Sequence, residues 1–403
     1  MGDLMRRYWL PGLLAEEIPE PDCPPVRIKL LGEELVAFRD SLGRIGLLED
    51  ACAHRGTSLS FGRNEECGLR CIYHGWKYDV DGNVLETPAE PPGSDFKGKL
   101  HHTAYPTQEV AGIVYTYMGP ADKIPLFPSY EWAQLPLEQI YTSKCLQECN
   151  YLQCLEGDCD SSHLSYLHRG FKQSTADGGD PRLYGLDGAP DLTPVDTDFG
   201  VRMISQRKAD EGQTYLRVSN FVMPSAAFVP TGGTQGNREG YTVHAYTPAD
   251  DEHCWRYMIN FKRQRPIRAE ERKQTPHIAP DYRKVRNLSN NYLQDREEQA
   301  KATFIGVGTS FLVHDSVATE TMGPVFDRSK EHLGASDKTV IAVRRFMLET
   351  VKAFQKGTEP PHIVTRAEAN AFHHIACIAV EVPSSKDADE FIEEYIDRMR
   401  NEG

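Results

Sequence analysis

The sequence lacks long apolar runs, an excess of basic residues and internal repeats. No stretch reaches about 18 consecutive apolar residues, so we expect no transmembrane helix and no membrane contact. Lysine and arginine number 45 against 59 aspartate and glutamate, a net charge of −14 that argues against nucleic-acid binding. Low-complexity segments are also missing from the 403 residues. A globular protein of two or three domains is therefore expected.

A secretory leader is not expected either, and this bears on the ten cysteines. The N-terminal stretch MGDLMRRYWLPGLL is interrupted by Pro11 and is followed by no small-residue cleavage site, so we interpret it as a short amphipathic helix. Without secretion, reduced thiols and a metal site are favoured over disulfides, and a cytoplasmic protein is expected. Four bunched cysteines match no familiar metal spacing and are interpreted as helix-packing residues: Cys145, Cys149, Cys154 and Cys159.

Alternating apolar residues and turn signals divide the chain into two parts. Residues 26–50 predict short antiparallel strands, and Asp81–Gly82 predicts a hairpin within further strands at 69–85. A proline-rich stretch at 119–136 indicates a linker. Beyond it the pattern is α+β, an antiparallel sheet with helices to one side. Strands are expected within 198–262, and helices at 146–168, 288–302, 338–356 and 387–402.

Two Cys-His pairs stand in the first part, in the stretch CAHRGTSLSFGRNEECGLRCIYHGW. Cys52 and His54 are separated by one residue, and Cys71 and His74 by two. Four such ligands bind either one zinc ion or a [2Fe–2S] cluster with both cysteines on one iron and both histidines on the other. Zinc sites usually pair like with like, whereas here each half supplies one cysteine and one histidine. The spacing therefore favours the cluster over zinc.

A second group of metal-binding side chains follows in NYLQCLEGDCDSSHLSYLHRG. His163 and His168 offer two imidazoles, and iron that activates oxygen uses two histidines and one carboxylate on one face. On an ideal helix their separation of five places the two side chains about 140° apart. Both histidines reach one metal only if the helix bulges or ends between them, an irregularity that tends to mark functional sites.

Both motifs resemble those of one family, the Rieske non-haem iron oxygenases. C-x-H-R-G followed by C-x-Y-H-G-W-K-Y is similar to its cluster motif, and Asp160, His163 and His168 match its D-x-x-H-x₄-H motif. The resemblance covers nearly the whole chain, and RRYWLPGLLAEE and NNYLQDREEQ are similar to phthalate 4,5-dioxygenase-like oxygenase subunits. It implies three parts: an N-terminal segment, 1–23, that packs on the catalytic domain; a β-rich Rieske [2Fe–2S] domain, 24–120; and a helix-grip catalytic domain, 121–403.

The resemblance also implies roles for single residues. It assigns the four Cys-His residues to the Rieske cluster. Asp160 takes the position of an aspartate that bridges a cluster histidine of a neighbouring subunit to an iron histidine, here His74 to His163. Electrons then cross between subunits, which implies a homo-oligomer, a trimer or stacked trimers. Asp158 is a rival for this bridge, but it lies five positions before His163 instead of three.

The third iron ligand is implied by SFLVHDSVATETMGPVFDRSK. In the phthalate-type branch an aspartate is followed five positions later by glutamate, so Asp315, with Glu320, is the expected ligand of the mononuclear Fe(II). Many relatives carry glutamine immediately before that aspartate, where this chain has His314, whose part in the site stays open. Glu156, four positions before Asp160, is either a carboxylate behind the iron ligands or an outer helix position.

The implied function is the terminal oxygenase component of a multicomponent system. Electrons from NADH arrive through a separate flavin and iron–sulfur reductase, and O2 serves dihydroxylation, monooxygenation or O-demethylation of an aromatic carboxylate such as a phthalate-, chlorobenzoate- or phenoxybenzoate-like acid. A carboxylate needs a cationic partner, and Arg217, on a strand expected to line the catalytic sheet, is the candidate. Two alternatives stay open, a Rieske electron carrier without oxygenase activity and a zinc-stabilised binding module.

Overall fold

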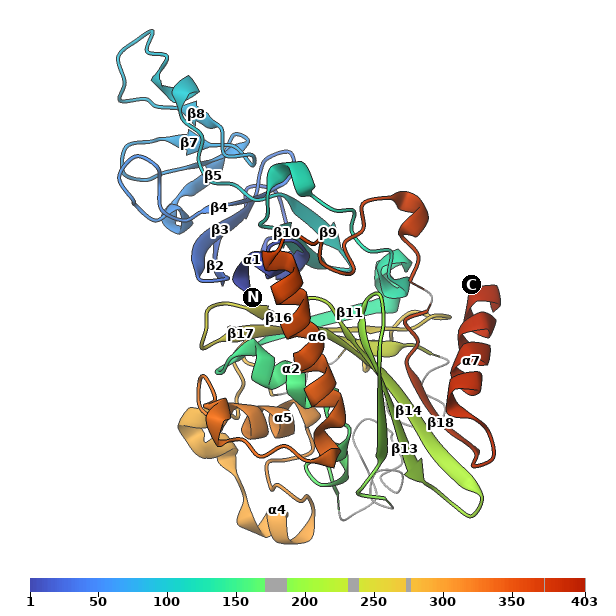
Figure 1. Cartoon of the computed structure of the whole chain (residues 1–403). Helices are drawn as coiled ribbons and strands as arrows, with labels where there is room; N and C mark the ends of the chain where they lie inside the picture. Colours follow the sequence, from blue (N-terminus) through green and yellow to red (C-terminus); the bar gives the residue numbers. More distant parts are fainter. Residues whose placement is uncertain (171–186, 231–238, 273–276, 373, 403) are drawn as a thin grey trace. The chain divides into compact units, whose positions relative to one another are not determined.

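The chain folds into two compact units, shown in the computed structural model of Figure 1. The first unit comprises Met1–Pro125 and Thr247–Asp250, and the second comprises Leu126–Tyr246 and Asp251–Gly403. The boundary near Pro125 lies within the proline-rich stretch that the sequence indicates as a linker. The structure describes residues 1–170, 187–230, 239–272, 277–372 and 374–402.

The described part of the first unit contains three small antiparallel sheets. Their orders are β1-β10-β9, β2-β3-β4 and β5-β6-β7-β8. The strands are β1 (Trp9–Leu14), β2 (Val26–Leu30), β3 (Glu33–Arg39), β4 (Ile45–Glu49), β5 (Arg63–Glu65), β6 (Gly68–Arg70), β7 (Lys77–Tyr78), β8 (Val84–Glu86), β9 (Thr107–Val110) and β10 (Ile113–Tyr117). The helical turns are α1 (Gly2–Met5) and the 3₁₀ helices η1 (Ala15–Glu17), η2 (Leu59–Phe61), η3 (Phe96–Lys99) and η4 (Ala121–Lys123).

Strand β3 separates two hydrophobic cores in this unit. Because successive side chains of a strand point to opposite faces, Leu35 and Ala37 enter one core while Val36 and Phe38 enter the other. The run LVAF is therefore apolar at every position instead of alternating with polar residues. The second core also contains both cysteines of the Cys-His pairs, so the fold holds these side chains firmly.

The N-terminal segment is mostly strand, and the predicted amphipathic helix is wrong beyond its first turn. Trp9–Leu14 pairs antiparallel with Ile113–Tyr117. Pro11 has no N–H to continue a helix, and a register shift between Pro11 and Leu13 accommodates it in the strand. Segment 1–23, for which the sequence predicts packing on the catalytic domain, lies in the first unit and supplies an edge strand of the β1-β10-β9 sheet.

One large antiparallel sheet forms the basis of the second unit, which has the predicted α+β architecture. Its order among the described strands is β11-β17-β16-β15-β14-β13-β12, and β18 pairs with β14. The strands are β11 (Ile140–Gln147), β12 (Asp191–Asp196), β13 (Gly200–Lys208), β14 (Gln213–Val222), β15 (Ala226–Pro230), β16 (Tyr241–Pro248), β17 (Cys254–Phe261) and β18 (Ile378–Pro383). Residues 231–238, within the predicted strand region 198–262, lie outside the described residues.

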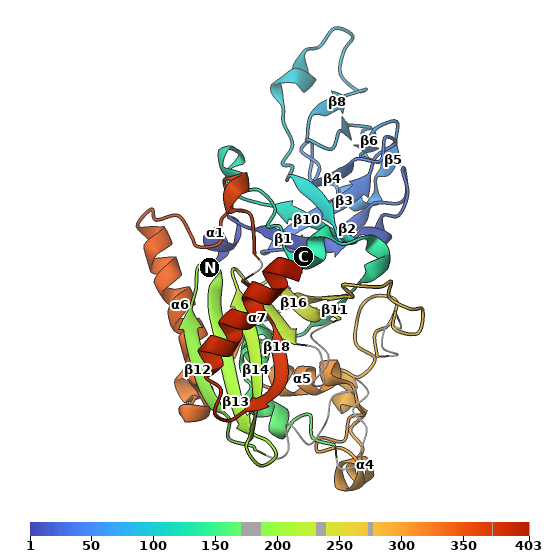
Figure 2. The same ribbon diagram turned by 90° about the vertical axis from the view of Figure 1, so that its right-hand side faces the viewer.

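Helical segments cover both faces of this sheet, whereas the sequence pattern predicts one (Figures 1 and 2). On one face Ile392 of α7 packs with Leu216 of β14, and on the other Leu164 of η7 packs with Tyr215 of β14. The helices are α2 (Tyr151–Cys159), α4 (Arg296–Lys301), α5 (Phe311–Glu320), α6 (Lys338–Gln355) and α7 (Ala388–Glu402). The 3₁₀ helices are η5 (Glu131–Gln134), η6 (Leu137–Gln139), η7 (Ser162–Ser165), η9 (Leu288–Leu293), η10 (Arg328–Lys330), η11 (Ala335–Asp337) and η12 (Ala367–Ala369).

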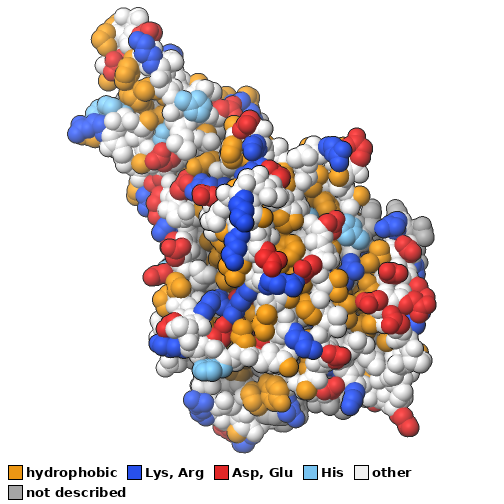
Figure 3. Space-filling view, viewed as in Figure 1, with side chains coloured by type: hydrophobic (Ala, Val, Ile, Leu, Met, Phe, Trp, Pro, Cys, Tyr) orange, Lys and Arg blue, Asp and Glu red, His pale blue; other side chains and the backbone are white. Residues whose placement is uncertain are grey.

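Helix α7 lies where the sequence predicts a helix, and it is amphipathic. Ile392 and Ile396 are buried against the sheet. Figure 3 shows acidic side chains gathered over this helix, and its exposed acidic residues are Asp389, Glu390, Glu393, Glu394 and Asp397. No helix in the described part of the chain is long and apolar enough to cross a membrane.

Two predicted helices are shorter than expected. In the region 146–168, α2 ends at Cys159, and Gln147 still belongs to strand β11. In the region 288–302, a 3₁₀ segment precedes the short helix α4. Three consecutive residues with positive φ interrupt it: Asn291 (49°), Tyr292 (53°) and Leu293 (48°). Positive φ is incompatible with a right-handed helix, so the pattern alone overestimates its length.

Candidate metal centres

The two Cys-His loops have the same backbone hydrogen bonds. In each, the cysteine N–H donates to the carbonyl five residues on, at 2.9 Å for Cys52 and 2.8 Å for Cys71. The glycine four residues on donates back to the cysteine carbonyl, at 2.8 Å for Gly56 and 3.1 Å for Gly75. Both glycines have φ near +75°, 76° and 75°, a region that favours glycine. Two separate parts of the chain thus present their ligands on matching turns.

In these loops the cysteines point inward and the histidines outward. Cys52 and Cys71 are each 3% exposed, and the Tyr78 hydroxyl lies 3.0 Å from the Cys52 Sγ. His54 is exposed, His74 is half-buried, and their ring centroids lie 4.5 Å apart. A cofactor held here has a buried side bound by sulfur and a side bound by histidine that faces solvent.

These four side chains fit a two-iron cluster and not a single zinc ion. A tetrahedral zinc requires ligand atoms within about 4.6 Å of one another. All four residues are among those described, and no three of them offer atoms that all lie within 4.8 Å of one another. The His74 Nδ1 is buried and makes no hydrogen bond within the described structure, which suits a nitrogen whose lone pair faces a metal. Burial raises the pKa of the Cys71 thiol, so metal binding is what deprotonates it.

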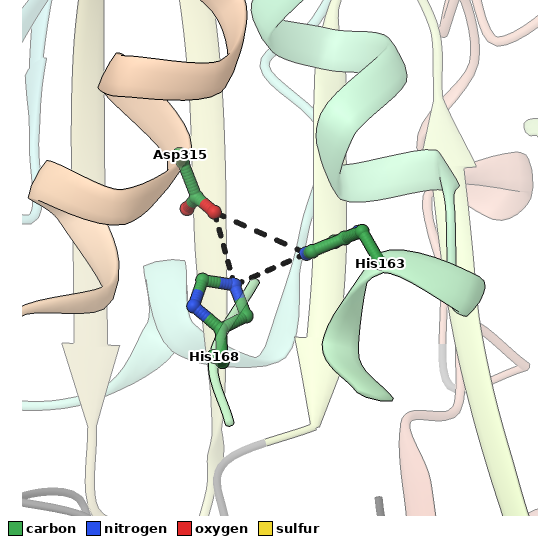
Figure 4. Close-up of side chains that lie close together, drawn as sticks. All are labelled: His163, His168 and Asp315. Carbon is green, nitrogen blue, oxygen red and sulfur yellow. Dashed lines mark hydrogen bonds and ion pairs between the residues drawn. The ribbon is translucent and has the colours of Figure 1, made fainter. Parts of the chain in front are cut away.

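A second set of ligand atoms converges in the second unit (Figure 4). The His168 Nε2 lies 3.0 Å from Asp315 Oδ1 and 3.1 Å from His163 Nε2, and the latter nitrogen lies 3.9 Å from Asp315 Oδ1. These separations let one ion lie about 2.0–2.2 Å from all three atoms, the bond length of divalent metals to nitrogen and oxygen. Two histidines and one carboxylate are the donor set of oxygen-activating non-haem iron. Among the described residues no other group of three His, Cys, Asp or Glu side chains converges in this way.

The end of helix α2 and the turn that follows it determine where the two histidines lie. Helix α2 ends at Cys159, the 3₁₀ helix η7 carries His163, and His168 follows the end of η7. The interruption that the five-residue spacing requires is therefore a helix end followed by a 3₁₀ turn. The buried Arg207 of β13 reinforces this turn, because its guanidinium donates to the Ser161 carbonyl at 2.5 Å.

Docking of α5 on α2 brings the carboxylate to the histidines. Asp315 lies in the middle of α5. The buried Gln153 of α2 donates to the carbonyls of Thr319 and Gly323, each at 3.0 Å, and accepts from the Phe326 N–H at 2.9 Å. One polar side chain thereby joins α2 to the C-terminal end of α5 and to the loop that follows it. This contact sets the distance between Asp315 and the histidines.

The charges of the three residues suit a metal. Burial acts to raise the pKa of Asp315, but His168 and Arg256 hold it well below its usual range. Burial lowers the pKa of His168 to about 4, so its imidazole is neutral. Burial also acts to lower the pKa of His163, but Asp160 produces a net rise. Carboxylate and neutral imidazole are the forms that bind metal.

Asp160 and its rival Asp158 have different surroundings. Asp160 caps the C-terminal end of α2, its Oδ2 lies 3.7 Å from the His163 Nδ1, and its side chain is 24% exposed. The Asp158 side chain is 10% exposed and lies 2.9 Å from the His244 Nδ1 and 2.5 Å from the Tyr246 hydroxyl. Of the two, Asp160 is the carboxylate that lies next to an iron histidine and also reaches the surface.

Sequence reasoning missed Arg256, which lies behind Asp315. This buried guanidinium is 3.3 Å from Asp315 Oδ2 and 3.9 Å from Asp158 Oδ1. Arg256 therefore occupies one oxygen of Asp315 and leaves Oδ1 to face the histidines. The signal in the sequence is weak, a single charged residue inside the apolar strand CWRYMINF.

The structure also shows the surroundings of Glu156 and His314, whose roles the sequence left open. Glu156 accepts hydrogen bonds from Arg328 at 2.9 Å and from Arg344 at 2.6 Å, which join α2 to η10 and α6. It therefore serves helix packing. His314 is buried on α5 with its Nδ1 3.2 Å from the Nδ1 of His168. His314 thus lies behind one of the metal-facing histidines.

Arg217 lies on the face of β14 that η7 covers. Neighbouring positions alternate, since Leu216 packs with α7 while Tyr215 packs with Leu164, the residue after His163. Arg217 shares the Tyr215 face by this alternation, and it is 9% exposed. A buried cation is therefore placed on the same side of the sheet as the histidine turn.

Comparisons with known proteins show the family to which the chain belongs. The Rieske [2Fe-2S] domain family matches residues 8–110, and the family described as LigXa C-terminal domain like matches residues 116–397. The chain is 40% identical to the phthalate 4,5-dioxygenase oxygenase subunit of Pseudomonas putida, over 89% of this chain and 84% of the relative. It is 32% identical to the 3-chlorobenzoate-3,4-dioxygenase oxygenase subunit of Comamonas testosteroni, over 90% and 88%. Its fold is similar to that of dicamba monooxygenase bound to 3,6-dichlorosalicylic acid, with a TM-score of 0.62 and 17% identity over 88% of this chain and 99% of that one.

The fold and the two centres define an oxygenase with two kinds of metal site. The chain belongs to the Rieske non-haem iron oxygenases, in the branch whose catalytic part is LigXa C-terminal domain like. Its cofactors are a Rieske [2Fe–2S] cluster and a mononuclear non-haem iron. It is an oxidoreductase that acts as a terminal oxygenase component, so the electron-carrier alternative is wrong.

Proposed function

We propose that the four Cys-His residues of the first unit hold the cluster and that the triad of the second unit holds the iron. The convergence of His163, His168 and Asp315 on one point is the observation that carries this assignment. When bound, the cluster transfers single electrons and the iron activates O2 for insertion into an organic substrate. Around the iron, Arg256 orients Asp315, and Gln153 holds α5 against α2, the helix that precedes the turn with His163.

Asp160 is proposed to bridge a cluster histidine of a neighbouring subunit to His163 and so to couple electron transfer between subunits. Its side chain lies beside the His163 Nδ1 and reaches the surface, and the cluster histidines His54 and His74 also face solvent in their own unit. A carboxylate between two such imidazoles accepts a hydrogen bond from each and fixes both tautomers. This arrangement needs a neighbouring copy that brings its cluster to Asp160, which supports a homotrimer or stacked trimers.

The proposed substrate is an aromatic carboxylate. The relatives named above act on phthalate and 3-chlorobenzoate, and their identity extends over most of both chains. Arg217 supports the same class, because a buried cation on the η7 side of the sheet provides a partner for an anion that enters there. Dihydroxylation, monooxygenation and O-demethylation all use the same metal ligands, so the shape around the substrate decides among them.

Electrons are proposed to come from NADH through a separate reductase with flavin and iron–sulfur centres. The chain supplies a cluster whose histidine side is accessible, as an acceptor of electrons from another protein requires. The proposed dependence on NADH, and ten cysteines none of which forms a disulfide, support a cytoplasmic protein.

Single-turnover oxidation by the full chain, loaded with both metals, tests this function. Chemically reduced protein is mixed with O2 and a panel of aromatic acids, with the corresponding amides as neutral controls. We expect oxygenated product from at least one acid, little from its amide, and none from His163→Ala. Product from His163→Ala contradicts the iron site, and product from the amides but from no acid contradicts the substrate class.

A further inference from the structure

His314 connects an iron-facing histidine to a backbone carbonyl. It is 2% exposed, and its Nδ1 lies 3.2 Å from the Nδ1 of His168. Its other ring nitrogen, Nε2, lies 2.8 Å from the carbonyl oxygen of Gly308. The chain of contacts therefore runs from Gly308 through His314 to His168 and ends at the His168 Nε2, which faces Asp315.

The hydrogen bonds in this chain determine where each proton lies. A carbonyl oxygen only accepts, so the His314 Nε2 carries a hydrogen and donates it to Gly308. The Nδ1 of a neutral His314 is then an acceptor, and the contact at 3.2 Å requires His168 to donate from its own Nδ1. A neutral imidazole with its hydrogen on Nδ1 has its lone pair on Nε2. That is the atom of His168 that converges with His163 and Asp315.

The ring of His168 is also held in orientation. Its plane is within 15° of the plane of His314, and the facing nitrogens are closer (3.2 Å) than the ring centroids (5.3 Å), so the two rings meet edge to edge. Phe311 stacks on the face of His168, with centroids 4.1 Å apart and planes 15° apart. His314 therefore holds the edge of the His168 imidazole, and Phe311 holds its face.

The far end of the chain is anchored as well. Gly308 has a φ of +87°, a conformation that favours glycine, and its N–H donates to the Glu298 carboxylate of α4 at 2.8 Å. Glu298 also accepts from the Thr303 hydroxyl at 2.7 Å. The carbonyl that His314 binds is thus part of a rigid turn and can impose its direction on the imidazole.

We propose that His314 is a positioning residue, which sets the tautomer and the orientation of His168 and so presents its Nε2 to the iron. This inference rests on the proposed iron site. The two iron histidines are then supported differently, because a carboxylate, Asp160, lies beside His163 while a neutral imidazole supports His168. Glutamine has an amide NH2 that donates and a carbonyl oxygen that accepts, so it can supply both kinds of hydrogen bond that His314 makes.

The affinity of the mononuclear site for Fe(II) in two variants tests this role. Full-length protein with an intact cluster is dialysed anaerobically against Fe(II), and bound iron is measured. His314→Leu removes both hydrogen bonds and should weaken the affinity about 10- to 100-fold, whereas His314→Gln should stay within about threefold of the parent. Parent-like affinity in His314→Leu overturns the proposal, as does a loss in His314→Gln as large as that in His314→Leu. Glu156→Gln, at an ion pair of helix packing, is the matched control and should bind Fe(II) normally.

Two further measurements separate this inference from the iron site itself. If His168→Ala keeps its full mononuclear iron, the site is wrong and the inference falls with it. If His168→Ala loses that iron while His314→Leu binds normally, only the role of His314 is wrong. Nitrogen NMR of the unmodified protein, labelled at histidine and with Zn(II) in place of the mononuclear iron, needs no variant to fold. A hydrogen on the Nδ1 of His168 is expected, and a hydrogen on its Nε2 overturns the proposal.

Discussion

The two metal centres differ in how the chain brings their ligands together. The proposed cluster ligands fall within one stretch of sequence, on two loops that are closed by their own backbone hydrogen bonds and glycines. The proposed iron ligand Asp315 reaches His163 and His168 through the docking of α5 on α2, and the hydrogen bond from Gln153 to Thr319 spans 166 positions. The first centre is thus specified locally, whereas the second depends on the packing of the unit around it.

The largest effect is expected from Cys71→Ser, which breaks the local centre. Loss of one buried sulfur ligand should remove the cluster and expose a gap in the second core of the first unit. The iron triad contains no residue of this unit, so the variant should retain about one iron and no acid-labile sulfide per chain. Full sulfide in this variant would contradict the assignment of the cluster.

Asp160→Asn should leave both centres occupied and slow the transfer of electrons between them. The amide keeps the shape of the carboxylate but loses its charge, and removal of such a partner typically costs about 10- to 100-fold. Stopped-flow absorption of the reduced cluster, mixed with O2 and substrate, measures the rate. An unchanged rate would show that Asp160 is not the bridge.

A smaller effect, confined to substrate binding, is expected from Arg217→Met. Loss of a charge-assisted hydrogen bond should raise KM for a carboxylate substrate about tenfold or more, with little change for its neutral amide. Arg217→Lys keeps the charge and serves as the control. Equal effects on acid and amide would mean that Arg217 supports the fold of the sheet and not the substrate.

Glu156→Gln should have the smallest effect, because Glu156 belongs to helix packing. The carboxylate pairs with Arg328 and Arg344, both partly buried, and its loss should lower the free energy of unfolding by about 1 kcal/mol. Chemical denaturation measures this change, and metal analysis should show both centres intact. Loss of the mononuclear iron alone would place Glu156 with the iron ligands after all.

Local features could be predicted from the sequence, and features that depend on packing could not. The spacing of the Cys-His pairs indicates the cluster, and the separation of His163 from His168 predicts a broken helix. The helix expected at the N-terminus is wrong because pairing of Trp9–Leu14 with β10 overrides the local pattern. Similarly, the sequence pattern predicts one helix over residues 288–302, but residues with positive φ divide this region in the structure.

The surroundings of the iron ligands were the hardest to predict. Asp315 itself was identified only through resemblance to a family, since no local pattern links it to His163. Arg256 has no motif around it, and its contact with Asp315 arises only when β17 and α5 pack together. His314 differs from the glutamine that the family resemblance implies at this position, and its bond to His168 depends on the path of the chain between them. Such partners follow from the fold and not from sequence spacing.

Iron and acid-labile sulfide per chain, measured in the parent and in Asp315→Ala, test the central claim most directly. Both proteins are purified anaerobically at full length. Two independent centres predict about three irons and two sulfides in the parent, and about two irons and two sulfides in the variant. A third iron that stays in Asp315→Ala, or a parent that contains zinc and no sulfide, would contradict the account.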